Sequence, residues 1–182
     1  RVAAGEAALP PAVGLSGSVE VMALDLGSLD SVRRFVEAFR AKHDTLHGLV
    51  NNAGVMNTPF GRTAEGFETQ IGINYLGHFL LTELLLETLR AGAPSRIVCV
   101  SSVAHAGVRS RPATIDLDDL HFARRRYDGT VAYCQSKLAL VIYARHLGSR
   151  LAGSGISAFS THPGWVRSNL VQHTAPVWVQ NT

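Results

Sequence analysis

Apolar and polar positions follow two different periods along this chain. Four short apolar runs are typical of buried strands, and each ends in a turn of small or polar residues: 19–24, 48–50, 96–100 and 156–160. Between them, apolar residues recur three or four positions apart, which predicts amphipathic helices: one starting after an N-cap at Ser28, one over 63–89 and one over 127–150. An Ala-rich stretch at 1–9 predicts a further short helix.

The alternation of strands and helices predicts an α/β fold with a doubly wound parallel sheet. Parallel strands need helical crossovers, and we expect the helices to cover both faces of the sheet. In such a sheet the carboxyl ends of the strands share one edge, where ligands bind. The turns at those ends are therefore expected to be neighbours in space: Asp25, Asn51 to Gly54, Ser101-Ser102 and Pro163-Gly164. Taken singly, each of them is an ordinary αβ turn.

Tyr133 and Lys137 lie four residues apart in the last predicted helix, so both side chains project from the same face. A nearby ammonium favours the phenolate and lowers the tyrosine pKa from about 10 toward neutrality, where general acid–base catalysis is efficient. A surface tyrosine beside a solvated lysine has the same spacing. The pair alone is therefore a weak signal, and its surroundings must decide between the two interpretations.

Composition restricts the classes of protein that fit. The 182 residues are 46% apolar, enough for the core of one domain over 1–182, and a net charge of +3 carried by scattered arginines predicts no nucleic-acid partner. No apolar run reaches the length of a membrane-spanning helix, and no metal-ligand spacing occurs. Cys99 and Cys134 lie in apolar segments, which predicts buried thiols in a reducing compartment.

Six motifs, in their order and spacing, resemble the short-chain dehydrogenase/reductase family over nearly the whole chain. They are Asp25-Leu26, Asn51-Asn52-Ala53-Gly54, Ile73-Asn74-Tyr75-Leu76-Gly77-His78-Phe79, Val100-Ser101-Ser102, Tyr133-Cys134-Gln135-Ser136-Lys137 and Pro163-Gly164-Trp165-Val166-Arg167-Ser168. The sequence around them is most similar to the branch that holds retinol dehydrogenases and the WW-domain oxidoreductase, with protochlorophyllide reductase as a more distant relative. The resemblance implies a Rossmann-type fold that uses NAD or NADP.

The same resemblance implies catalytic roles for four residues. Tyr133 would be the general acid–base, and Lys137 would hold the nicotinamide ribose and lower the pKa of the phenol. Ser102, rather than Ser101, would hydrogen-bond the substrate oxygen. Asn74 would support a water that relays protons to Lys137, which would account for an asparagine inside a helix.

The resemblance also implies a cofactor-binding set. Asp25 would contact the adenine amino group, Asn51 and Ala53 would line the adenosine side, and Val166 with Ser168 would touch the carboxamide end. The set in full is Asp25, Leu26, Asn51, Ala53, Gly54, Tyr133, Lys137, Pro163, Gly164, Val166 and Ser168. Serine stands at 168 where the family more often has threonine, and it keeps the hydroxyl.

One family motif does not occur in this sequence. The glycine-rich turn T-G-x-x-x-G-x-G, whose amides and following helix bind the pyrophosphate, is absent. Gly14 and Gly17 lack the strand–turn–helix context that this motif requires. We therefore expect a single partial NAD(P)-binding Rossmann domain over 1–182, without the first β-α-β unit and the C-terminal part of the family's fold.

These observations predict an NADP-preferring oxidoreductase, with NAD as the alternative cofactor, that interconverts a lipophilic alcohol and its carbonyl, such as a retinoid, steroid or aldehyde. One alternative is a non-catalytic scaffold relative that has lost cofactor binding. Another is an enzyme like protochlorophyllide reductase. The helices around 70–90 and 127–150 resemble the family's dimer-forming pair, which is consistent with a homodimer. We expect a cytoplasmic protein, and the branch is compatible with membrane association.

Overall fold

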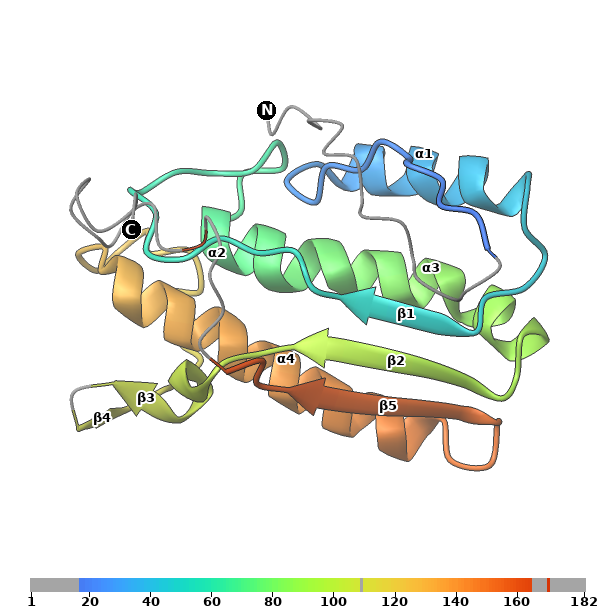
Figure 1. Cartoon of the computed structure of the whole chain (residues 1–182). Coiled ribbons are helices and arrows are strands. Elements are labelled where there is room, and N and C mark those ends of the chain that lie inside the picture. Colours follow the sequence, from blue (N-terminus) through green and yellow to red (C-terminus); the bar gives the residue numbers. More distant parts are fainter. Residues whose placement is uncertain (1–16, 109, 165–169, 171–182) are drawn as a thin grey trace, which may run out of the picture.

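A parallel sheet of three strands forms the centre of the molecule (Figure 1). The computed structural model describes residues 17–108, 110–164 and 170. The strands are β1 (Gly48–Asn51), β2 (Ser95–Val100) and β5 (Ile156–Thr161), in the order β1-β2-β5. Val50, Val98 and Phe159 stand side by side in the parallel register. The parallel α/β architecture expected from the alternating pattern is confirmed.

Two long helices, α3 (His78–Ala91) and α4 (Gly129–Arg150), connect these strands and pack behind the sheet (Figure 1). Their contact layer is one apolar cluster: Leu89, Ile97, Cys99, Leu140, Tyr143, Ala144, Leu147, Leu151 and Ile156. The inward residues of β2 recur with period two, as a strand covered on one face requires. Burial of this apolar layer stabilises the fold by about 25 cal/mol per Å² of apolar surface removed from water.

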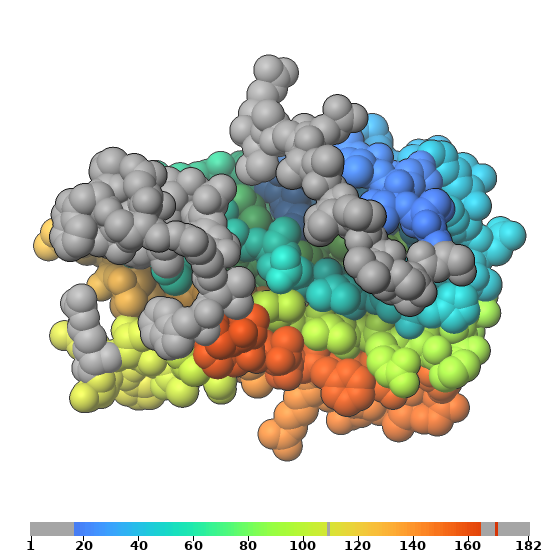
Figure 2. Space-filling view, viewed as in Figure 1, coloured from blue at the N-terminus to red at the C-terminus, as the bar shows by residue number. Residues whose placement is uncertain are grey.

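In the part of the chain that the structure describes, the long helices cover one face of the sheet (Figure 1). Both crossovers step in the same direction along the order β1-β2-β5, and right-handed crossovers that step in one direction place their helices on the same face. On the opposite face Val50 is 61% exposed and Phe159 is 50% exposed. Figure 2 looks onto this face, where atoms of β2 and β5 are visible.

Helix α1 (Leu29–Arg40) extends the helical layer by packing against α3. Ser28 caps it as predicted, because its side chain accepts a hydrogen bond from the Ser31 amide. Val32 and Val36 of α1 are buried with Leu81 and Leu85 of α3.

The strand predicted at 19–24 is not formed. Residues 17–24 run along α1 without a strand neighbour in the described part of the chain, and Val19 and Val21 are 73% and 76% exposed. A strand exists only through hydrogen bonds to another strand, so an apolar β-type run alone does not make one.

The helix predicted over 63–89 is divided into pieces and starts later. Residues 63–68 form a turn in which Gly66 has a φ of +85°, a value that favours glycine. The helix begins with α2 (Thr69–Ile71), passes through a π-helical stretch η1 (Gly72–Gly77) and continues as α3. π-Helical turns inside α-helices are rare and occur mostly at functional sites.

The loop between β2 and α4 contains small elements that the apolar pattern did not predict. They are a 3-10 turn η2 (Val103–Ala106) and the antiparallel pair β3 (Gly107–Val108) and β4 (Arg111–Pro112). The predicted helix at 1–9 lies outside the described residues. Within the described ranges, every helix is too short or too polar to cross a membrane.

Candidate functional site

Three residues that are far apart in the sequence meet at the carboxyl edge of the sheet. Gly54 follows β1, Asn74 lies in η1 and Lys137 lies in α4. A Cβ placed on Gly54 would lie 3.0 Å from Asn74 Oδ1 and 3.7 Å from Lys137 Nζ. The strand-end turn therefore lies directly against the two predicted site residues.

Asn74 is fully buried and uses its whole carboxamide for hydrogen bonds. Its Oδ1 accepts from the Val55 amide at 2.8 Å, and its Nδ2 donates to Val55 O and to Ser136 Oγ, each at 2.9 Å. This pairing is the reason for an asparagine inside a helix: its side chain supplies the donor and acceptor that hold the turn after β1. The Ser136 hydroxyl in turn donates to the Tyr133 carbonyl at 2.8 Å.

Lys137 is a buried cation without a carboxylate partner among the described residues. Only 4% of it is exposed, and its Nζ donates to Val100 O at 2.9 Å. Burial lowers the pKa of Lys137 to about 8, because it disfavours the charged form. The amine thus lies below the rim with donor capacity to spare.

Tyr133 shares the face of α4 with Lys137, as the spacing predicted. The expected lowering of its pKa by Lys137 is not found: burial raises the pKa of Tyr133, and a hydrogen bond from the Ser102 side chain acts in the opposite direction. Burial is the largest cause, and Lys137 Nζ, 5.6 Å from the centre of the phenol ring, donates its hydrogen bond to the Val100 carbonyl instead.

The two serines after β2 have different roles in the structure. Ser101 is buried, and its hydroxyl donates to the Lys137 carbonyl at 2.8 Å, which ties β2 to α4. Ser102 is half-buried, its hydroxyl accepts from the Ala104 amide at 3.2 Å, and its side chain acts to lower the pKa of Tyr133. The choice of Ser102 over Ser101 as the serine that binds the substrate oxygen stays a prediction.

His78 lies under the site as a buried, neutral side chain. Its Nδ1 lies 2.9 Å from the Asn74 carbonyl oxygen, to which a neutral imidazole donates. Burial, together with the nearby charge of Lys137, lowers the pKa of His78 to about 4. Its interpretation as a packed, hydrogen-bonded histidine agrees with this geometry.

The predicted adenosine-side residues separate into exposed and buried groups. Asp25 is exposed, and its carboxylate accepts from the Gly27 amide at 2.8 Å. Leu26 is buried in the α1–α3 cluster. Asn51 does not present its side chain to the rim: it is buried, and its Nδ2 donates to Thr82 Oγ1 at 2.8 Å. The bond to Thr82 holds the Asn51 side chain in the core.

The remaining cofactor-binding residues follow β1 and β5. Ala53 is exposed beside Gly54. Pro163 and Gly164 are exposed after β5, and Gly164 has a φ of +79°, a turn conformation that favours glycine. Val166 and Ser168 lie outside the described residues.

Sequence reasoning missed a buried polar cluster beside the site. Gln70 and Glu68 are fully buried, and both hydrogen-bond the Tyr127 hydroxyl, at 2.9 and 3.1 Å respectively. The available signal was weak: two polar residues occupy the first turn of the helix that carries Asn74, a position where solvated side chains are common.

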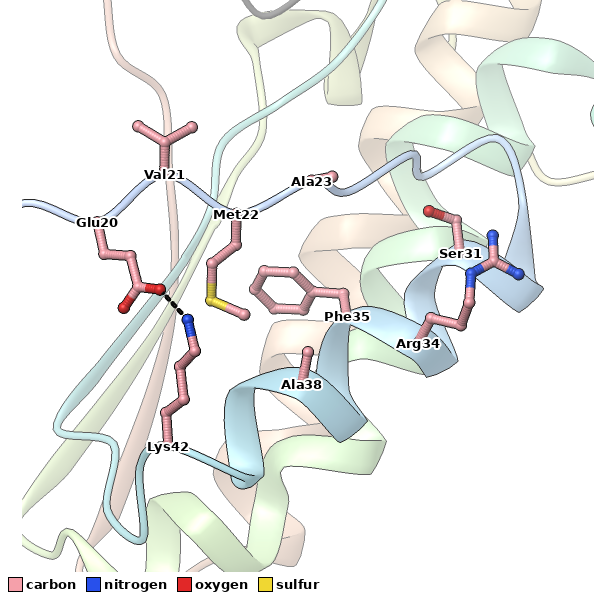
Figure 3. Close-up of a pocket in the computed structure, with 9 residues that line it drawn as sticks. All are labelled: Glu20, Val21, Met22, Ala23, Ser31, Arg34, Phe35, Ala38 and Lys42. Carbon is pink, nitrogen blue, oxygen red and sulfur yellow. Dashed lines mark hydrogen bonds and ion pairs between the residues drawn. The ribbon is translucent and has the colours of Figure 1, made fainter.

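A hollow of about 430 Å³ lies away from this edge of the sheet, between residues 20–23 and α1 (Figure 3). Met22 and Phe35 point toward each other inside it, and Lys42 reaches Glu20 at one end. It shares no residue with the predicted site.

The residues at the rim fit the nicotinamide end of a dinucleotide. A glycine without room for a side chain, a buried amine and a phenol near that amine converge there. Backbone that must approach a ligand closely requires glycine, and a cation with free donors suits ribose hydroxyls.

Comparisons with known proteins agree with this geometry. The family model described as short chain dehydrogenase matches residues 3–113, more than half of the chain. Human retinol dehydrogenase 12 is 49% identical over 88% of this chain and 49% of its own length, so the chain spans about half the length of the curated relatives it matches.

Solved structures show the same fold. An uncharacterised protein from Mycobacterium paratuberculosis is 44% identical with a TM-score of 0.72, over 88% of this chain and 56% of that one. The RhlG/NADP active-site complex from Pseudomonas aeruginosa is 27% identical with a TM-score of 0.63, over 82% of this chain and 54% of that one. With its parallel Rossmann-type sheet and these matches, the chain belongs to the short-chain dehydrogenase/reductase family and is similar to its retinol dehydrogenases.

Proposed function

We propose that the protein is an NADP-preferring oxidoreductase that interconverts a lipophilic alcohol, of the retinoid type, and its carbonyl. The observation that carries the proposal is Lys137, a cation 4% exposed with no carboxylate partner among the described residues, beside Tyr133 and Gly54. Burying an unpaired cation is costly. A non-catalytic scaffold would gain nothing from a buried, unpaired amine. A site that binds ribose and transfers a proton requires one.

The residues of the chain divide the chemistry among them. In the direction of reduction, the Tyr133 hydroxyl gives its proton to the carbonyl oxygen, and the Ser102 hydroxyl hydrogen-bonds the same oxygen as charge develops on it. A nicotinamide cofactor, when bound, supplies the hydride. The raised pKa of Tyr133 keeps the phenol protonated near neutral pH, which suits an acid in this direction.

Lys137 and Asn74 support these two groups. The pKa of Lys137, lowered to about 8, leaves most of the amine charged at pH 7, so it can donate hydrogen bonds to ribose hydroxyls. Asn74 fixes the position of the turn after β1 through its two hydrogen bonds to the backbone of Val55.

Similarity to human retinol dehydrogenase 12 supports a retinoid substrate, and the NADP complex among the structural relatives supports the choice of cofactor. Half-exposed Phe79 and Ile142 on the outer faces of α3 and α4 support a homodimer through these helices.

The test uses the full-length protein with all-trans-retinal and either NADPH or NADH. We expect reduction of retinal with a kcat/KM at least about tenfold higher for NADPH than for NADH, a difference of roughly 1.4 kcal/mol in transition-state stabilisation. A protein that shows no thermal shift with either cofactor and no turnover would instead be the scaffold relative.

A further inference from the structure

We infer that Gln70 is a positioning residue that holds the catalytic helix α4 and the loop after β1 in register with each other; the inference rests on the proposed function. Gln70 lies in α2, one helical turn before Asn74, and is fully buried. None of the six family-like motifs includes it.

The carboxamide of Gln70 makes three hydrogen bonds to two other segments of the chain. Its Oε1 accepts from the Asn57 amide at 2.8 Å, and its Nε2 donates to the Gly129 carbonyl at 2.8 Å and to the Tyr127 hydroxyl at 2.9 Å. Both amide protons are used, and the oxygen has a backbone partner. No hydrocarbon side chain of similar size can replace these bonds.

The segments that Gln70 joins are those that carry the site. Asn57 lies in the loop after β1, three residues beyond Gly54, and Gly129 is the first residue of α4, one turn before Tyr133. The two segments approach closely, since a Cβ on Gly129 would lie 2.5 Å from Asn57 Oδ1. A small displacement of Gln70 therefore shifts the start of α4 relative to the turn after β1, in which Gly54 lies beside Lys137.

Tyr127 and Glu68 hold Gln70 in place from the other side. The Tyr127 hydroxyl lies 3.1 Å from both Glu68 Oε1 and the Thr58 carbonyl, and its ring packs edge-on against Phe60 and Phe122. The buried Glu68 carboxylate also accepts from the amides of Gln70 and Ile71, at 2.9 and 2.8 Å. The whole cluster is thus hydrogen-bonded, as a polar network in a core must be.

A residue that only stabilised the fold would affect turnover no more than any other buried hydrogen bond. Ser95 provides that control, because its buried hydroxyl donates to the Leu89 carbonyl at 2.9 Å at the opposite end of β2. Misplacement of reacting groups by about 1 Å can cost about 100-fold in rate. Positioning therefore predicts a loss of kcat in a folded protein.

The experiment compares Gln70→Met, Tyr127→Phe and Ser95→Ala in the full-length protein, with all-trans-retinal and NADPH, below the melting temperature of each variant. We expect Gln70→Met to lower kcat at least about tenfold with an NADPH Kd changed less than about twofold, and Tyr127→Phe to lower kcat by a smaller factor. Ser95→Ala should keep its kcat.

Two results would overturn the inference. The first is a folded Gln70→Met variant whose kcat equals that of Ser95→Ala. If Gln70→Met does not fold, a Tyr127→Phe variant with the same kcat as Ser95→Ala overturns the inference in its place. The second is unchanged hydrogen exchange, measured as follows.

If the unmodified protein reduces no retinal, the proposed function fails, and hydrogen exchange then tests the role of Gln70 separately. Faster exchange at 55–58 and 129–133 in Gln70→Met or Tyr127→Phe, but not in Ser95→Ala, supports it, and unchanged exchange refutes it.

Discussion

Asn74 donates a hydrogen bond to the Ser136 hydroxyl over 2.9 Å and so connects η1 to α4 between Tyr133 and Lys137. The same carboxamide pairs with both backbone groups of Val55. One fully buried side chain therefore holds three segments of the site in fixed positions relative to one another: the turn after β1, the π-helical stretch and α4.

Replacing Asn74 should strongly destabilise the fold. Asn74→Ala removes two bonds to Val55 and one to Ser136 and leaves the buried partners unsatisfied, so we expect a loss of about 3 kcal/mol in the free energy of unfolding. Urea denaturation measures this loss. The exposed Asn52 is the matched control, and Asn52→Ala should change stability by less than about 0.5 kcal/mol. Equal losses for the two variants would contradict the role of Asn74.

Gly77 should not tolerate a side chain. A Cβ at this position would lie 2.5 Å from the Leu26 carbonyl oxygen, which is backbone and cannot rotate away. Gly77→Ala should therefore cost about 1–3 kcal/mol and displace the Asp25-Leu26 turn. Gly48, where a Cβ would meet nothing within 4 Å, supplies the control Gly48→Ala. Thermal unfolding of both variants tests the contrast, and a Tm for Gly77→Ala at or above that of Gly48→Ala would refute it.

His78 should make the protein less stable in acid. Its pKa in the folded state is lowered to about 4, so between that value and its ordinary value of 6.5 the unfolded chain binds a proton that the folded chain does not. Stability contributed by the neutral imidazole is thus complete above pH 6.5 and is lost as the pH falls toward 4. At pH 5 the loss is about 2 kcal/mol.

The variant His78→Gln isolates this contribution, because glutamine does not titrate and can still donate to the Asn74 carbonyl. Urea unfolding at pH 7 and pH 5 should show a smaller decrease for His78→Gln than for the unmodified protein. The exposed His162 serves as control, and His162→Gln should follow the unmodified protein. Identical decreases for His78→Gln and the unmodified protein would rule out the buried imidazole as the cause.

The sequence predicted those parts of the site that depend on the spacing within one helix or on the shared edge of parallel strands. Tyr133 and Lys137 share a face because both lie on one helix, and Gly54 and Ser102 reach one edge because parallel strands end there. The Gln70 cluster could not be predicted, since its partners lie 13 to 59 residues away in the sequence. A buried glutamine and a solvated one look the same in a helical pattern.

The errors in the fold have a similar origin. The run at 19–24 has the composition of a strand, but pairing depends on a neighbour that composition does not provide. The π-helical stretch at Gly72–Gly77 contains Asn74, which bonds Val55 and Ser136 together. The periodicity of apolar residues cannot predict such a tertiary requirement. The prediction of a lowered pKa for Tyr133 is wrong because spacing gives the face of a helix and not how deeply the phenol is buried.

The most direct test is Tyr133→Phe in the full-length protein, measured by single-turnover reduction of all-trans-retinal with NADPH and by NADPH binding. Phenylalanine keeps the ring and removes only the proton donor, so binding should stay within about twofold while the rate falls by at least about 100-fold. A Tyr133→Phe protein that reduces retinal at the rate of the unmodified protein would contradict the assignment of Tyr133 as the general acid.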